Sequence, residues 1–154
     1  MRRKLGWHIL GISGRLKFDD GREVRVGAKL EAHEVLRPWD RGVPAKVLHI
    51  GHCGMHASER LGDALTWHPY GAGVVCRVQV SDEIYCKTDQ FVGRYRRVLW
   101  AVRLNVQEYT DLVEIGCFCQ DEHRAWQYLR GLGPHRRIVS GSLVPVPGWV
   151  EHVR

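Results

Sequence analysis

Gly73-Val-Val-Cys-Arg-Val-Gln-Val80 is the most regular stretch of the sequence. Its apolar side chains recur at every second position, at Val74, Cys76, Val78 and Val80. Because alternate side chains of a strand point to the same face, this spacing predicts a strand with one face in the core.

Further strands are predicted on both sides of this stretch. Short apolar runs bounded by glycine, proline or polar residues are typical of strands. The predicted strands are Trp7–Ile12, Lys46–Ile50, Phe91–Leu104 and Ile138–Val146, and residues 33–45 are predicted to form a loop.

The region around Gly21 predicts a β-hairpin. Apolar side chains alternate with charged ones on both sides of Asp19-Asp20-Gly21. A three-residue loop there sets Leu16 opposite Val24 and keeps both apolar rows on one face, with Gly21 in the left-handed conformation.

Three short helices complete the prediction. The first spans Ser58–Trp67 with Ser58 as its N-cap, the second follows Asn105, and the third spans Asp121–Arg130. Strands with short helices inserted irregularly indicate an α+β fold, with a small, twisted, mostly antiparallel sheet. We expect one domain over residues 1–154, with a core at about 5–146 and a short C-terminal extension.

The composition limits the classes of protein. The 154 residues are 44% hydrophobic and carry a net charge of +6, which suits one globular domain. No apolar run approaches the ~20 residues of a membrane span, and the N-terminus is too polar for a secretory signal. Five cysteines without framework spacing predict reduced thiols and a cytoplasmic protein, with no membrane partner.

Positive charge is concentrated in residues 1–30 and 91–103, whereas residues 104–122 contain acids and neither lysine nor arginine. In Arg94-Tyr-Arg-Arg-Val-Leu-Trp100, arginines alternate with aromatic residues, as suits contact with phosphates and bases. We therefore predict nucleic-acid contacts by Arg94, Arg96 and Arg97. In a strand, Arg94 and Arg96 share one face and Arg97 takes the other, so a solvated, charged edge strand is the alternative.

A metal site is not expected. His49, His52, Cys53 and His56 are ligand types, as are Cys117, Cys119 and His123, but neither group has Cys-x-x-Cys spacing. Cys53 beside a histidine could act as a nucleophile, although nothing distinguishes it from the other cysteines.

The order of several features resembles a family of small phage and prophage domains. Gly54-Met-His-Ala-Ser58 leads into the helical Asp63-Ala-Leu65, a Cys76-Arg-Val78 strand follows, and Asp89-Gln90 forms a turn. The resemblance covers about residues 5–105. It implies a protein that acts in the host cytoplasm, in host takeover or counter-defence.

More distantly, this order is similar to the ADP-ribosyltransferase fold, whose cofactor is NAD. By this resemblance His8 would bind the ribose, His56 would face the nicotinamide, and Ser58 would support His56. Gln90 or Asp89 would stand where the family has its catalytic acid. This chain departs from the family pattern because Ile9 follows His8 and because no acid occupies the third position itself.

Two functions follow as expectations. One is an NAD or nucleotide site, with ADP-ribose transferred to a host macromolecule by His8, His56 and the Asp89-Gln90 turn. The other is a non-enzymatic phage protein that binds a host protein or nucleic acid through its basic strand. His8 and His56 as purely structural histidines remain an alternative, and the oligomeric state is left open.

Overall fold

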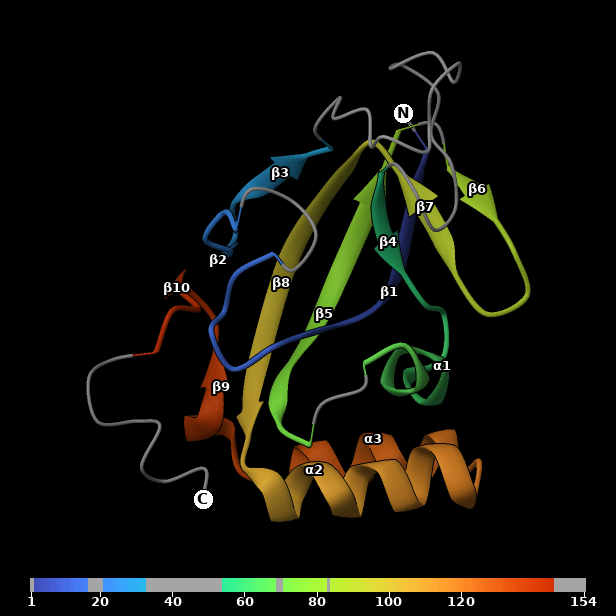
Figure 1. Ribbon diagram of the computed structural model, residues 1–154, viewed down its shortest axis with the longest axis vertical. Coiled ribbons are helices and arrows are strands. Elements are labelled where there is room, and N and C mark those ends of the chain that lie inside the picture. The colour runs from blue at the N-terminus through green and yellow to red at the C-terminus, as the bar shows by residue number, and fades with distance from the viewer. Residues whose placement is uncertain (1, 17–20, 33–53, 69–70, 83, 146–154) are drawn as a thin grey trace.

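A computed structural model describes residues 2–16, 21–32, 54–68, 71–82 and 84–145. These residues form an α+β protein with two mostly antiparallel sheets and a few short helices (Figure 1). The predicted fold class is therefore confirmed at this level.

The larger sheet has seven strands. Its main order is β1 (Arg3–Leu10), β5 (Gly73–Ser81), β8 (Tyr95–Leu104), β2 (Arg25–Val26) and β10 (Gly141–Ser142). Two further strands, β3 (Lys29–Glu31) and β9 (Arg137–Ile138), also pair with β8. The long strands β1, β5 and β8 cross most of the molecule (Figure 1).

Strand β5 lies in the middle of the core, as its alternation predicts. Val74, Cys76, Val78 and Val80 have no exposed surface and belong to one core cluster. Val75 is equally buried, but in a second cluster on the other face. Both faces of the strand are thus covered, whereas the alternation predicted only one.

The smaller sheet consists of β4 (Met55–Ala57), β7 (Phe91–Gly93) and β6 (Tyr85–Cys86). The single long strand predicted over Phe91–Leu104 is therefore wrong, because the chain leaves this sheet at Arg94 and enters the larger one as β8. Gly93 permits this crossing, since a Cβ there would lie 2.4 Å from Cγ1 of Val80. At Arg94 the backbone N–H donates to the carbonyl of Asp82 instead of continuing a ladder.

The described residues include three α-helices, α1 (Leu61–Thr66), α2 (Val106–Val113) and α3 (Glu122–Gly131). In Figure 1, α2 and α3 lie below the long strands, and α1 lies just above these two helices, on the right. Helix α2 follows Asn105, as predicted, and Asn105 caps it through a capping box with Glu108. Asp121 caps α3. A π-helical turn at Glu114–Phe118 follows α2.

The predicted N-cap of α1 is wrong. The backbone of Ser58 pairs instead with Trp7, its N–H donating to the Trp7 carbonyl at 2.9 Å and its carbonyl accepting at 2.7 Å. Helix α1 begins three residues later, and the N–H groups of Leu61 and Gly62 donate to the carboxylate of Glu122 at 2.6 and 3.4 Å. An acid from another helix thus replaces the local cap that the sequence suggested.

The hairpin keeps the predicted face but not the predicted register. Arg15 pairs with Glu23, and the N–H of Leu16 donates to the carbonyl of Arg22 at 2.9 Å. The pairing is therefore offset by two residues. Because the offset is even, Leu16 and Val24 still face the same core cluster. Gly21 has the expected positive φ of 75°.

Some predicted elements differ in extent. The first strand starts at Arg3 rather than Trp7, and the last predicted strand is reduced to β9 and β10. The predicted loop 33–45, the strand 46–50, residues 17–20 of the hairpin and Val146 lie outside the described residues.

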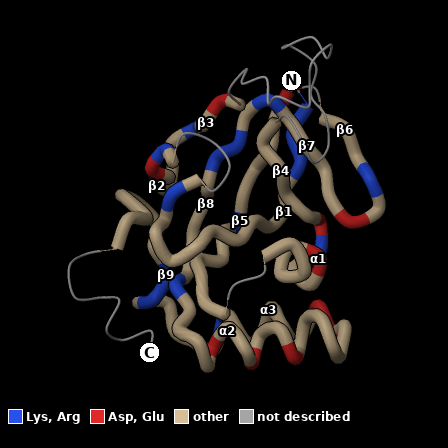
Figure 2. Tube along the Cα trace, viewed as in Figure 1, with Lys and Arg blue, Asp and Glu red and all other residues tan. Residues whose placement is uncertain are grey.

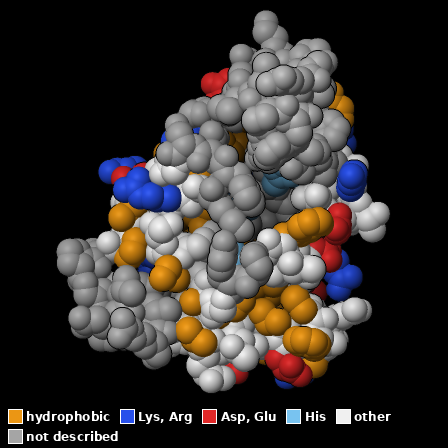
Figure 3. Space-filling model, viewed as in Figure 1, with side chains coloured by type: hydrophobic (Ala, Val, Ile, Leu, Met, Phe, Trp, Pro, Cys, Tyr) orange, Lys and Arg blue, Asp and Glu red, His pale blue; other side chains and the backbone are white. Residues whose placement is uncertain are grey.

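Charge is unevenly distributed over the fold. Acidic residues lie along α2 and α3, and many of the basic residues lie on the strands (Figure 2). Hydrophobic side chains gather on the lower part of the face in Figure 3, and Trp67 and Phe118 are 58% and 76% exposed. Among the described residues, no helix combines the length and hydrophobicity needed to cross a bilayer.

Candidate functional site

One face of the larger sheet carries polar side chains within an apolar core. His8 pairs with Cys76 across β1 and β5, and Arg96 pairs with Val80 across β5 and β8. Paired residues of neighbouring strands share a face. His8, Cys76 and Arg96 therefore lie on the face that also contains Val78 and the first core cluster.

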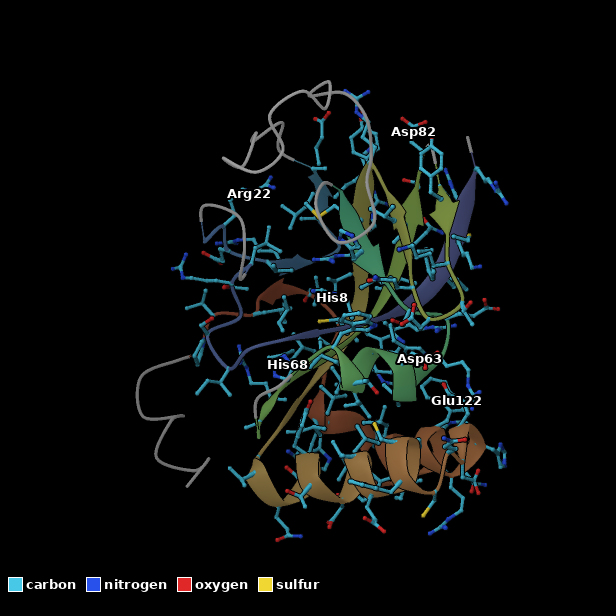
Figure 4. All side chains as sticks on the ribbon, turned by 45° about the vertical axis from the view of Figure 1, so that its right-hand side comes forward. His8, Arg22, Asp63, His68, Asp82 and Glu122 are labelled. Atoms are coloured by element: carbon cyan, nitrogen blue, oxygen red, sulfur yellow. The ribbon has the colours of Figure 1, made fainter. Side chains whose placement is uncertain are left out.

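His8 is a neutral imidazole in a positively charged environment. Its pKa is well below the usual value because the ring is desolvated, and because Arg96, His56 and His68 all act on it as cations. No carboxylate of the described residues is among these neighbours. Figure 4 shows His8 just above α1, with His68 farther along, at the left of that helix.

Arg96 is the most deeply buried charged group of this face, at 3% exposure. Its Nη1 donates to the backbone carbonyl of His56 at 2.7 Å, which joins β8 to β4 of the smaller sheet. Burial lowers its pKa to about 10, so the guanidinium is still charged at neutral pH. No described carboxylate pairs with it, and Arg22 adds further positive charge nearby.

A buried guanidinium without a carboxylate is costly to desolvate. A buried charge that no carboxylate neutralises is often found where a ligand or a mechanism uses the charge, since stability alone favours an apolar side chain there. The face around Arg96 and His8 is therefore the candidate site, and its charge favours an anionic ligand.

The structure brings together three of the residues predicted for the site. His56 is close enough to His8 to depress its pKa, and its Nδ1 lies 3.1 Å from the carbonyl of Gly54. Ser58 is paired through its backbone with Trp7, directly before His8. The isolated bridge between Trp7 and Ser58 connects the end of β4 to β1.

His68 was not predicted as a site residue. Its ring Nε2 lies 3.1 Å from the carbonyl of Ala72, and its own carbonyl accepts a hydrogen bond from the hydroxyl of Tyr109. These contacts hold His68 where α1 ends and where it adds to the positive field on His8. A histidine directly after a predicted helix gave no sequence signal for this role.

The predicted acid is not part of this cluster among the described contacts. Asp89 and Gln90 precede β7, and the carbonyl of Gln90 accepts from the N–H of Lys87 at 2.7 Å. Ala57 pairs with Phe91, so the turn lies just beyond the end of the β4–β7 ladder. The electrostatic neighbours of His8 include neither residue.

The basic strand does not form a single nucleic-acid surface. Arg96 is buried, so its predicted contact with nucleic acid at the surface is wrong. Arg94 is exposed and forms an ion pair with Glu31 at 3.0 Å. Arg97 is exposed and alternates away from Arg96. The edge-strand alternative is also wrong, since β8 has partners on both sides.

The described residues around the candidate site offer neither a reactive thiol nor a group of metal ligands. Burial raises the pKa of the Cys76 thiol to about 12, so this thiol is protonated at neutral pH and is a poor nucleophile. No group of three potential metal ligands occurs among the described residues. His49, His52 and Cys53, the other candidates, lie outside those residues.

Comparison with known proteins gives one weak similarity. An aromatic prenyltransferase from Botryotinia fuckeliana (strain B05.10) is 26% identical over 149 residues, which cover 89% of this chain and 46% of that protein. The chain thus spans about half the length of this relative. No family model matches the sequence, and no solved structure matches it.

Proposed function

We propose that the face around His8 and Arg96 binds a ligand through a diphosphate group, and that this ligand is NAD or a related nucleotide. The buried guanidinium of Arg96, which pairs with no carboxylate among the described residues, carries this proposal. A diphosphate would supply the negative charge that the described residues of this face do not. The resemblance to ADP-ribosyltransferases supports NAD as the particular ligand.

In this proposal Arg96 contacts the diphosphate and His8 binds the adjacent ribose. His56, tied to Arg96 through its carbonyl, takes the nicotinamide side. The neutral His8 ring can both donate and accept a hydrogen bond, which suits a ribose hydroxyl. Ser58 holds β4 against the first strand, so that the two histidines keep their spacing.

The reaction that fits such a site is transfer of ADP-ribose. The bond between C1′ of the ribose and the nicotinamide nitrogen breaks, and nicotinamide leaves with the bonding electron pair. A nucleophile on the acceptor bonds to C1′ and loses its proton. Asp89 or Gln90 would have to approach the ribose when the ligand binds, because no described contact links them to His8.

The weak relative supports a second candidate within the same ligand chemistry. That protein is named an aromatic prenyltransferase, and prenyl donors also carry a diphosphate. A prenyl diphosphate would place its phosphates on Arg96 and its hydrocarbon chain against the first core cluster.

Calorimetric titration distinguishes these ligands. Inorganic pyrophosphate, ADP-ribose, NAD and geranyl diphosphate are each titrated into the wild-type protein. We expect pyrophosphate to bind, with NAD and ADP-ribose binding more tightly and geranyl diphosphate not exceeding pyrophosphate. Tighter binding of geranyl diphosphate would favour the prenyl donor, and no binding of any of them at millimolar concentration would refute the proposal.

The variants test which residues make the site. Arg96→Met should weaken binding of pyrophosphate and NAD by about tenfold or more, as loss of a charge-assisted contact does. His8→Ala should weaken NAD binding more than pyrophosphate binding, because only NAD offers a ribose. Arg97→Ala removes the same charge one residue away on an exposed side chain and should bind as wild type. Release of nicotinamide, followed by mass spectrometry, then tests the transfer step separately.

A further inference from the structure

Tryptophan and arginine alternate across the other face of the larger sheet. Trp7 on β1 pairs with Arg77 on β5, and Arg77 pairs with Trp100 on β8. Arg137 on β9 pairs with Val102, which places it on the same face as Trp100. Four neighbouring strands thus present a row of indole, guanidinium, indole and guanidinium.

Helix α3 adds a third indole to this row. The ring of Trp126 is stacked on that of Trp100, with centroids 5.6 Å apart and an interplanar angle of 20°. Trp7 meets both rings edge-on, at 5.7 and 5.2 Å. We call the three indoles and the arginines that lie over them the Trp–Arg cluster: Trp7, Trp100 and Trp126 with Arg77, Arg137 and Arg130.

Each indole of the Trp–Arg cluster has its own arginine. Arg77 lies over Trp7 at 4.7 Å, Arg137 over Trp100 at 4.8 Å, and Arg130 over Trp126 at 5.6 Å. A guanidinium stacked on a ring is oriented by that ring, while its N–H donors in the plane stay free for other partners.

The outer part of the Trp–Arg cluster faces solvent. Arg130 and Arg137 are exposed, whereas Trp100 and Trp126 are partly buried. No ion pair with a described carboxylate involves Arg130 or Arg137. Basic residues gather at β9 in Figure 2. The surface therefore combines exposed cations with two indoles that are partly exposed.

We propose that the Trp–Arg cluster binds single-stranded nucleic acid. Arg130 and Arg137 contact successive phosphates through their in-plane N–H groups, and bases pack against the partly exposed rims of Trp100 and Trp126. A single strand offers both phosphates and free base faces, and binding sites for it combine these two groups. A duplex keeps its base faces stacked inside, and an acidic peptide would leave the indoles unused.

This surface is separate from the candidate site. His8 and Arg96 point to the first core cluster, whereas Trp7 and Trp100 pack with the second. It also differs from the basic strand predicted from the sequence, since neither Arg94 nor Arg97 contributes to it. Its failure or success is therefore independent of the diphosphate proposal.

Fluorescence anisotropy with labelled oligothymidylate and oligouridylate tests the proposal, with tryptophan quenching as a second signal. The double variant Arg130→Ala/Arg137→Ala should weaken binding by about tenfold. It should also reduce the slope of log K against log salt by roughly 1.4, at about 0.7 for each lost phosphate contact. Arg124→Ala removes an exposed charge from the same helix without touching an indole and should change binding little.

Trp126→Leu tests the stacking contribution, and we expect it to weaken binding and reduce quenching by the oligonucleotide. Circular dichroism verifies that each variant is folded. Equal losses in Arg124→Ala and the double variant would overturn the proposal, as would equal affinity for a duplex, for heparin or for a glutamate-rich peptide. Absence of binding at low salt would overturn it as well. His8→Ala should leave this binding unchanged.

Discussion

The two faces of the larger sheet bury positive charge in different ways. On one face Arg77 lies over the indole of Trp7, and its neighbours include the acid Glu122. On the other face the electrostatic neighbours of Arg96 are the cation Arg22 and the thiol of Cys76. Both arginines have a pKa lowered by burial, but only the first has aromatic and acidic groups to offset the cost.

This difference separates stability from ligand binding. A cation that its own surroundings compensate can be explained by packing alone. A buried cation that another cation approaches, and that no carboxylate offsets, is destabilising until an anion binds. Substitutions on the face with Arg77 should therefore change mainly the stability of the protein. Substitutions on the face with Arg96 should change mainly ligand binding and the pH dependence of stability.

The largest expected effect is on the face with the aromatic rings. Trp7→Ala should lower the free energy of unfolding by about 3–5 kcal/mol, because it removes a buried indole that meets two other tryptophans. Urea unfolding measures this loss. Trp67→Ala is the control, since Trp67 is 58% exposed and its loss should change stability by about 0.5 kcal/mol or less. Equal losses would contradict the role given to the aromatic cluster.

The next effect concerns the helices on the same face. Glu122→Ala removes the acceptor for the first two N–H groups of α1 and should cost about 1–2 kcal/mol. Ser58→Ala, at the N-cap predicted from the sequence, should cost less, because no described hydrogen bond joins its hydroxyl to α1. Thermal unfolding of the two variants shows which substitution costs more stability. A larger loss of stability in Ser58→Ala than in Glu122→Ala would mean that Ser58 caps α1 after all.

On the other face, His8 should make stability depend on pH. Its pKa is lower in the folded protein than in the unfolded chain, so the unfolded chain binds more protons below about pH 6.5. Stability is therefore complete above that pH and decreases as the pH falls, by at most about 1.4 kcal/mol per pH unit for this one group. Urea unfolding from pH 7.5 to 5 should be less pH-dependent in His8→Gln than in wild type.

An anion bound on this face should raise the pKa of His8, which NMR titration of the imidazole can follow. Pyrophosphate is the probe. An unchanged pKa at saturating pyrophosphate would mean that the anion binds away from His8. The control is Arg97→Ala, in which the shift should persist because that side chain is exposed and lies off this face.

The sequence predicted the parts of the fold that local patterns control. Alternation at Val74–Val80 placed β5 in the core, and Asn105 and Asp121 marked the starts of α2 and α3. Contacts between distant segments could not be predicted in this way. Glu122 caps a helix 61 residues away, and the break at Arg94 depends on the approach of Gly93 to Val80.

In the candidate site, too, some residues could be predicted from the sequence, and the contact that matters most could not. His8, His56 and Ser58 were predicted through a resemblance, and the structure places them together. Arg96 was assigned to a solvent-exposed surface, because charge in an alternating strand usually faces solvent. Its burial arises from the smaller sheet packing over β8, a tertiary contact with no signature in the strand itself. The same contact gives Arg96 its importance in the proposed site.

The smallest expected change in stability is at Arg96 itself. Arg96→Met loses the charge-assisted hydrogen bond to the carbonyl of His56, which costs about 1.5–3 kcal/mol. It also removes a buried charge that no described carboxylate compensates, which is favourable. The two terms oppose each other, so the free energy of unfolding should stay within about 1 kcal/mol of wild type, although the side chain is only 3% exposed.

Urea unfolding of Arg96→Met, with and without pyrophosphate, is therefore the most direct comparison of the two faces. Wild type should gain stability from pyrophosphate, because a ligand that binds only the folded state stabilises it, whereas the variant should gain almost nothing. Arg77→Met is the matched variant on the other face, and it should lose stability with its cation–π contact yet keep the response to pyrophosphate. If Arg96→Met lost several kcal/mol without ligand, Arg96 would be a structural residue and both faces would bury charge for the same reason.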